Sequence, residues 1–341
     1  MFRGGVHLDY FSDPSFDPVN VPISSKYTLF HNLLNPCRVA CHLIRLGHEP
    51  LPPKTSSTFL HLIRAIRRPL LFYPNAFTYS FYLLKTYGYW QVLTCGFFSS
   101  FCLDITHETV LFMNNRYLVQ RLLDSLEWMD DEDVLSNDQS TLLMHLIGKA
   151  SPREFSHLVR YFLLTRAYEV FVTQPFFVIM MRQIVGLISG EEGYSWFFQA
   201  VLSIYRESGF LGFFSGLVPR MLWELSRLGM YILIYSLINR SAVGVPQHLS
   251  NNFFFLLNIL TDVAVNVAAY PLQVVGSVMA LHGSRISTSE VAQANSFSSW
   301  RECLRFLISQ GLQYRGYFPF WRRAPPSAFT CPPPHSTPSA A

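Results

Sequence analysis

Five apolar segments, each near the length of a membrane-crossing helix, constrain this chain more than any other feature. A helix needs about 20 predominantly apolar residues to cross the hydrocarbon core of a bilayer. The segments lie at residues 27–46, 88–113, 158–189, 217–239 and 253–282. Each contains charged residues or histidines. The sequence therefore predicts an all-α membrane protein whose spans carry polar groups.

The overall composition favours a membrane protein over a soluble one. Hydrophobic residues make up 50% of the chain and charged residues only 14%, whereas soluble domains carry about 25% charged residues. The formal net charge is +4, and the basic residues are dispersed through apolar sequence. Because nucleic-acid binding needs a clustered basic patch, we expect membrane lipids as partners and no nucleic acid.

No pattern typical of a catalytic or metal site is present. The six cysteines form no CxxC pair and show no metal-ligand spacing with histidine, so we expect buried free thiols. GxSxG, HExxH and P-loop motifs are also missing from the sequence. The sequence predicts a protein that is not an enzyme and that holds no cofactor and no metal.

A threefold repeat organises the chain. A proline lies near the end of the first, third and fifth segments, and each is followed by a candidate surface helix, at 57–70, 194–208 and 298–310. A glycine-rich element comes next. A repeat of span, kink, surface helix, hinge and span typifies several transporter folds. The motif residues are Pro36, Pro175 and Pro271, then Gly209, Gly212 and Gly216, and Gly311 and Gly316.

The repeat divides the chain into six parts. Three units are predicted at 27–123, 141–240 and 241–323, the last of them truncated. An acidic insertion occupies 124–140 and is expected to be a solvated loop. Residues 1–26 form a variable N-terminal segment, and the Pro-rich tail 324–341 is expected to be disordered.

These motifs resemble the mitochondrial carrier family, whose repeats carry Pro-x-acid-x-x-base and later acid-Gly-x4-aromatic-base-Gly. Ser208-Gly209-Phe-Leu-Gly-Phe-Phe214-Ser215-Gly216 keeps the glycines and the aromatic residue, and Tyr314-Arg315-Gly316 keeps the motif's ending. The stretch Ile204–Arg220, together with Tyr270-Pro271 and residues 47–53, is most similar to the divergent outer-membrane branch of that family. The resemblance implies a three-repeat helical bundle in the mitochondrial outer membrane, with several membrane passes.

Solute transport is disfavoured by the content of the proline motifs. A carrier gates access through ion pairs between the acid and base of its three motifs. The acid slots here hold Arg38, Phe177 and Gln273, and the base slots hold Cys41, Met180 and Gly276. After Gly316 the chain is rich in proline and arginine, so no sixth span is expected. A ring that lacks one helix would open sideways to lipid.

Polar residues recur at helical spacing on four of the five segments. Since successive helical residues turn by about 100°, residues three or four apart share a face. A charged group in mid-membrane costs about 2.5 to more than 10 kcal/mol, so these stripes should face one another or water. We predict a hydrophilic groove, with ion pairs that merely hold the bundle together as the alternative. The groove residues are Arg38, His42, Arg45, Glu169, Arg220, Glu224, Arg227, Tyr231, Tyr235, Asn258, Asp262, Asn266 and Tyr270.

The resemblance also implies a function. The outer-membrane branch is known for insertases of α-helical, including tail-anchored, proteins, and phospholipid scrambling and docking of pro-apoptotic Bcl-family proteins are attributed to it. The branch's groove acid corresponds to Glu224. Its groove lysine falls near the uncharged Cys41, so Arg38, His42 or Arg45 would replace that lysine. Hydrophobic α-helical clients are the expected partners. The alternatives are a receptor or scaffold that recruits partners through 124–140, and, third, a solute carrier.

Overall fold

Long helices dominate the structure, which is a computed structural model describing residues 34–55, 71–125, 152–241, 250–284, 297–318, 320 and 322–323. The first described helix is α2 (Asn35–Leu46). The longest are α5 (Phe97–Ser125), α8 (Pro152–Ser189), α10 (Leu217–Ser241) and α11 (Ser250–Met279), and they fall on the other four predicted segments. The prediction of a mostly helical protein is confirmed.

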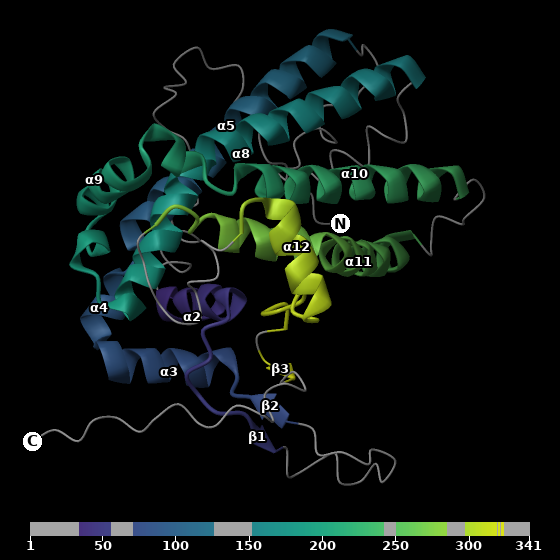
Figure 1. Cartoon of the computed structure of the whole chain (residues 1–341). Helices are drawn as coiled ribbons and strands as arrows, with labels where there is room; N and C mark the ends of the chain where they lie inside the picture. Colours follow the sequence, from purple (N-terminus) through teal and green to yellow (C-terminus); the bar gives the residue numbers. More distant parts are fainter. Residues whose placement is uncertain are drawn as a thin grey trace, which may run out of the picture.

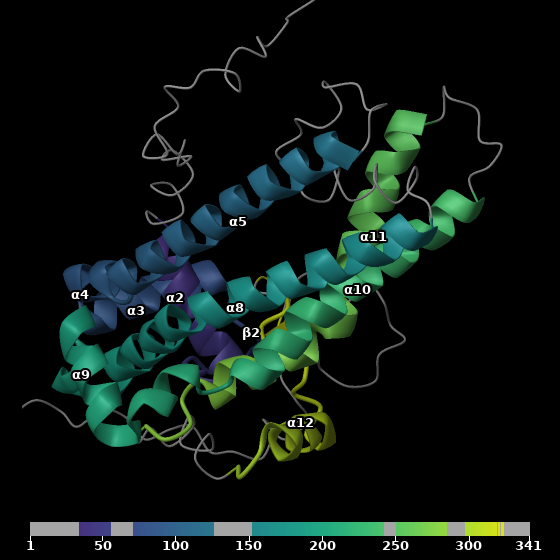
Figure 2. The same ribbon diagram turned by 90° about the horizontal axis from the view of Figure 1, so that it is seen from above.

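The four longest helices form a row in chain order. Helix α5 packs against α8, α8 against α10, and α10 against α11, while α2 contacts both α8 and α11 (Figure 1). Figure 2 shows α10 and α11 extending away from the end where α3, α4 and α9 gather. Polar residues on neighbouring helices of the row can therefore meet.

The described shorter helices are α3 (Ala76–Tyr87), α4 (Tyr89–Thr94), α9 (Phe197–Ser208) and α12 (Trp300–Ser309), with 3-10 turns at Glu192–Tyr194 and Phe210–Phe214. Helices α9 and α12 fall within the surface helices predicted at 194–208 and 298–310. The one predicted at 57–70 lies outside the described residues. Helix α3 was not predicted. It begins where the Asn75 side chain accepts a hydrogen bond from the backbone N–H of Thr78, at 2.8 Å.

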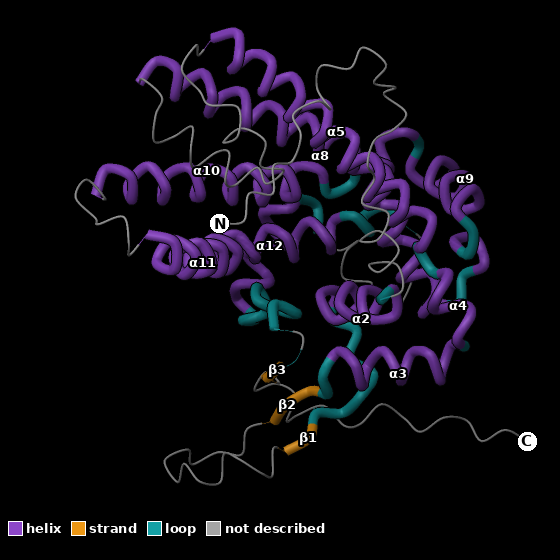
Figure 3. Tube along the Cα trace, turned by 180° about the vertical axis from the view of Figure 1, so that it is seen from behind, coloured by secondary structure: helices purple, strands orange, loops and turns teal. Residues whose placement is uncertain are grey.

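The all-α prediction omitted a small sheet. Strands β1 (Lys54–Thr55), β2 (Leu71–Tyr73) and β3 (Arg322–Arg323) pair antiparallel in that order, with Phe72 opposite both Lys54 and Arg323 (Figure 3). Arg322 forms an ion pair with Glu49 and donates to the Pro74 carbonyl. Strands of two or three residues are too short to show the alternation that identifies a strand.

The prolines and glycines of the repeat motif occupy distinct places. Pro36 lies in the first turn of α2, whereas Pro175 and Pro271 lie inside α8 and α11. Gly212 is buried in the turn after α9, and the other four motif glycines have positive φ. A Cβ on Gly216 would lie 2.8 Å from the Gly276 carbonyl oxygen, so the start of α10 touches the backbone of α11.

Buried polar contacts hold α9 against α8. The buried Arg182 of α8 donates to the His282 carbonyl at 3.0 Å and lies 3.7 Å from a Glu207 carboxylate oxygen. Tyr194 donates its hydroxyl to the same carboxylate at 2.5 Å. Burial, together with this hydrogen bond, raises the pKa of Tyr194, so its hydroxyl keeps the proton that it donates.

Two described stretches are long and apolar enough to cross a membrane, Phe155–Ser189 and Ile259–Met279. The variable segment 1–26 and the tail 324–341 lie outside the described residues. So does the acidic insertion 124–140, apart from the last two residues of α5.

Candidate polar site between the long helices

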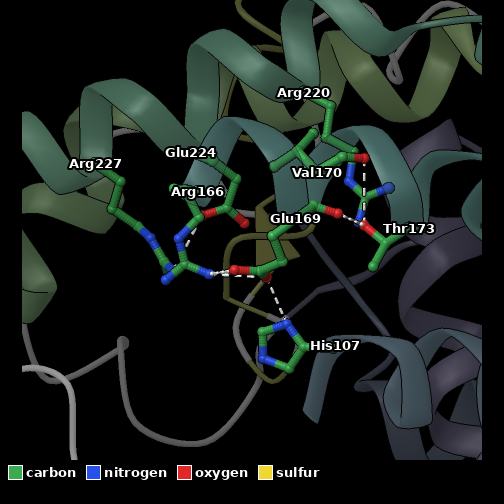
Figure 4. Close-up of polar contacts among 8 residues, drawn as sticks. All are labelled: His107, Arg166, Glu169, Val170, Thr173, Arg220, Glu224 and Arg227. Atoms are coloured by element: carbon green, nitrogen blue, oxygen red, sulfur yellow. Dashed lines mark hydrogen bonds and ion pairs between the residues drawn. The ribbon is translucent and has the colours of Figure 1, made fainter. Parts of the chain in front are cut away.

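Charged side chains from α5, α8 and α10 meet between these helices (Figure 4). Arg166 and Glu169 of α8 pair at 2.8 Å, and His107 of α5 lies 2.5 Å from the other Glu169 oxygen. Glu224 of α10 lies 3.3 Å from Arg227 and 3.9 Å from Arg166. We call His107, Arg166, Glu169, Glu224 and Arg227 the Arg–Glu cluster. It links three consecutive members of the row.

Arg220, at the start of α10, is held by contacts with α8. Its guanidinium donates to the Gln174 side-chain oxygen at 3.0 Å and to the Thr173 hydroxyl at 3.2 Å, and it lies 4.4 Å from the centroid of the Phe177 ring. Gln174 in turn donates to the Ser215 carbonyl at 2.7 Å. These contacts join α8 to the turn before α10, so Arg220 is held in one position.

Exposure rises from the centre of the Arg–Glu cluster to its edge. The Glu169 side chain is 7% exposed and Glu224 13%, whereas Arg227 is 27% and His107 37% exposed. Removing one member of a buried pair is costly because the other charge is left uncompensated. The centre can therefore hold the helices together, while Arg227 and His107 remain open to contact from outside.

A second polar group joins α10 to α11. The Tyr231 hydroxyl and the Asn266 side-chain amide both donate to Oδ1 of Asp262, the latter at 2.8 Å. We call these three residues the Asp262 set. Asp262 is exposed, and Ile259, Leu260 and Val263 beside it are exposed as well. A carboxylate thus lies on an otherwise apolar surface of α11.

The predicted groove residues of α2 are placed elsewhere. Arg38 donates to the Asn35 side chain at 2.6 Å, and the Arg45 guanidinium lies 5.8 Å from the centroid of the Tyr270 ring. Tyr270 donates to the Arg315 carbonyl at 2.8 Å, and Nδ1 of His42 is buried without a hydrogen-bond partner. Among the described contacts, none joins these α2 residues to the Arg–Glu cluster. The predicted stripes therefore form three polar groups.

Two predicted groove residues have undescribed side chains, and two residues of the Arg–Glu cluster were not predicted. Tyr235 lies in α10 and Asn258 in α11, but their side chains are outside the described part of the structure. His107 and Arg166 were not among the predicted groove residues. The spacing of Arg166 three residues before Glu169 could have identified it, since such residues are neighbours on a helix.

The long helices of the row are similar in sequence to a mitochondrial carrier protein. A sequence model described as mitochondrial carrier protein matches residues 162–244, a range that includes most of α8, all of α9 and all of α10. That range holds four of the five residues of the Arg–Glu cluster, together with Arg220.

Similarity to individual proteins extends over most of the chain. Mitochondrial carrier homolog 1 of Mus musculus is 27% identical over 301 residues, which cover 82% of this chain and 71% of that protein. Mitochondrial carrier homolog 2 of Homo sapiens is 24% identical over 286 residues, covering 83% of this chain and 87% of that protein. The chain is therefore a mitochondrial carrier homologue, and the similarity implies a mitochondrial membrane protein.

Proposed function

We propose that this protein is an insertase of the mitochondrial outer membrane for α-helical, including tail-anchored, proteins. In this proposal the polar flank of a client crosses the lipid along the Arg–Glu cluster and the Asp262 set, while its apolar segment leaves sideways into the bilayer. The observation that carries the proposal is that these two polar groups, one helical turn apart on α10 at Arg227 and Tyr231, together draw on α5, α8, α10 and α11.

The lengths of these helices support a multi-pass arrangement. They contain 29, 38, 25 and 30 residues, and each exceeds the roughly 20 residues that a span requires. Charged groups on α5 and α10 lower the mean hydropathy of these two helices. Because such groups are costly in lipid unless they face one another or water, a polar route between the helices would reduce the barrier for a client's flank.

We further propose three carrier-like repeats, with a sixth span absent. The prolines of α2, α8 and α11 fit three related units. The chain after Gly316 contributes β3 to the small sheet, close to where a sixth span would begin. A bundle with five spans would leave one side open to lipid, as lateral release of a client requires.

Insertion is better supported than solute transport. Two of the slots that would carry the gating charges serve packing instead: Phe177 lies against Arg220, and Gly276 approaches the backbone of Arg220. The charged pairs occupy other positions along α8 and α10. Saturable uptake of a labelled metabolite would contradict this preference.

The proposal is tested by reconstituting the purified protein into liposomes with a tail-anchored client. Glu224→Leu should reduce protease-protected insertion about tenfold, because Arg166 and Arg227 lose their shared partner. Leu233→Ala, an exposed apolar position on the same helix, is the matched control and should insert normally. Unchanged insertion by Glu224→Leu would contradict the proposal.

The same liposomes test the related activities. A polar route would also serve phospholipid headgroups, so we propose that the protein scrambles lipids, which a fluorescent-lipid reduction assay measures. If the wild-type protein inserts no client and still binds Bcl-family partners through residues 124–140, the receptor function replaces the insertase.

A further inference from the structure

The carboxylate of Asp262 is oriented but not neutralised. Among the described residues, Tyr231 and Asn266 both donate to Oδ1, and no described donor occupies Oδ2. Neither donor carries a positive charge. Among the described residues, no lysine, arginine or histidine forms an ion pair with Asp262.

The nearest cation along α10 is already engaged. Arg227 lies one helical turn before Tyr231, yet its guanidinium pairs with Glu224 at 3.3 Å and lies 5.3 Å from the centroid of the Trp223 ring. Within the described part of the chain, Arg227 thus has a carboxylate partner and Asp262 has no cation.

The surroundings of Asp262 strengthen its attraction for a cation. Asp262 lies within Ile259–Met279, one of the two described stretches that are long and apolar enough to cross a membrane. The exposed Ile259, Leu260 and Val263 flank it. Coulomb attraction is several times stronger beside such apolar surface than in bulk water. A charged residue of this kind in a membrane segment is a functional-site candidate by default.

We propose that Asp262, oriented by Tyr231 and Asn266, binds a basic side chain in the polar flank of a client helix. This inference rests on the proposed insertase function and assigns the Asp262 set its own ligand class. Because Oδ1 already accepts two hydrogen bonds, the site suits a single donor on Oδ2. A lysine ammonium fits this better than a bidentate guanidinium, which needs both oxygens.

A purely structural role for Asp262 is distinguishable from cation binding. Asn at this position has nearly the same shape, and its side-chain oxygen can still accept a hydrogen bond from the Tyr231 hydroxyl. The link between α10 and α11 would therefore persist. The negative charge would be lost. Asp262→Asn therefore separates the two roles.

The first test compares two tail-anchored clients that differ only in their polar flank, one with lysines and one with glutamines. Asp262→Asn should slow insertion of the lysine client three- to tenfold and slow the glutamine client much less, because Asn keeps the route polar and removes only the charge. Tyr231→Phe should slow the lysine client less, because the charge remains. Equal effects on both clients, or no effect on either, would overturn the proposal.

The second test does not depend on insertion. A carbodiimide joins a carboxylate to an adjacent amine as an amide and leaves as the corresponding urea. We would treat the reconstituted protein with a hydrophobic peptide that has one flanking lysine, and map the adduct by mass spectrometry. The matched peptide carries acetyl-lysine.

An adduct at Asp262 with the lysine peptide, lost with acetyl-lysine and in Asp262→Asn, supports the site even if insertion fails. Absence of that adduct in phosphatidylcholine liposomes would overturn it. So would preferential coupling to the lipid amine when phosphatidylethanolamine is added, since the ligand would then be a headgroup.

Discussion

The two polar groups on α10 differ in how their charges are compensated. The Arg–Glu cluster encloses its carboxylates: Glu169 is 7% exposed and contacts both Arg166 and His107. The Asp262 set instead leaves a carboxylate on the surface with two neutral donors. Helix α10 thus contributes to one group whose carboxylates are paired with cations, and to another whose carboxylate, Asp262 of α11, has no cation among the described residues. The difference indicates that the first holds the row of helices together and the second is available to a ligand.

The largest effect is expected at the centre of the Arg–Glu cluster. Glu169→Leu leaves Arg166 and His107 without their carboxylate, which should cost about 3–5 kcal/mol of stability. Thermal unfolding in detergent measures this. The exposed Glu108→Leu, on α5, is the control and should unfold near the wild-type temperature. Equal stability of both variants would show that the Arg–Glu cluster does not hold the helices of the row together.

The next effect concerns the position of α10, on which both polar groups depend. Gly216→Ala adds a Cβ 2.8 Å from the Gly276 carbonyl oxygen, at a φ of +72°, so we expect a loss of about 2–3 kcal/mol. Gly209→Ala has a similar φ of +66° and no atom within 4 Å of the added Cβ. It should lose only about 1 kcal/mol. Comparable losses in denaturant titration would show that contact with α11 does not fix α10.

Arg227 should show an effect on function greater than its effect on stability. Its side chain is 27% exposed and lies 3.3 Å from Glu224, so Arg227→Gln should cost about 1 kcal/mol or less in unfolding. Liposome insertion should slow about threefold, because the exposed edge of the cluster loses its charge. A large loss of stability with normal insertion would show that Arg227 holds the helices together and does not contact the client.

The smallest effect on stability is expected at Asp262. Asp262→Asn should change the free energy of unfolding by about 0.5 kcal/mol or less, since the residue is exposed and Asn keeps its neutral contacts. Denaturant titration beside Glu169→Leu checks the contrast. A loss comparable to that of Glu169→Leu would remove the distinction between the two groups.

Helical periodicity was enough to predict the long helices and the polar faces of α10 and α11. It placed Glu224, Arg227 and Tyr231 on one side of α10, and Asp262 with Asn266 on one side of α11. Which side chains pair depends on how the helices pack. Helical periodicity within one segment could not predict that His107 pairs with Glu169, which lies 62 residues further along the chain.

Packing also explains the predictions that differ from the structure. The α2 residues predicted for the groove make no described contact with the Arg–Glu cluster, while Asn35 donates to the carbonyls of Val92, Leu93 and Cys95, which fixes α2 against α4. The β-sheet depends on residues more than 200 positions apart, because Arg322 meets Glu49 and Pro74. Local sequence carries no signal for such pairings.

In the proposed route a client's polar flank follows the polar faces of α10 and α11 while its apolar segment meets lipid. Photocrosslinking a client trapped midway, with the crosslinker placed in turn at Arg227, Asp262 and Leu233, tests it most directly. We expect the flank to link to positions 227 and 262, and the apolar segment to link to position 233, which is 59% exposed. If the flank formed adducts at position 233 as often as at positions 227 and 262, the client's polar flank would not follow the proposed route.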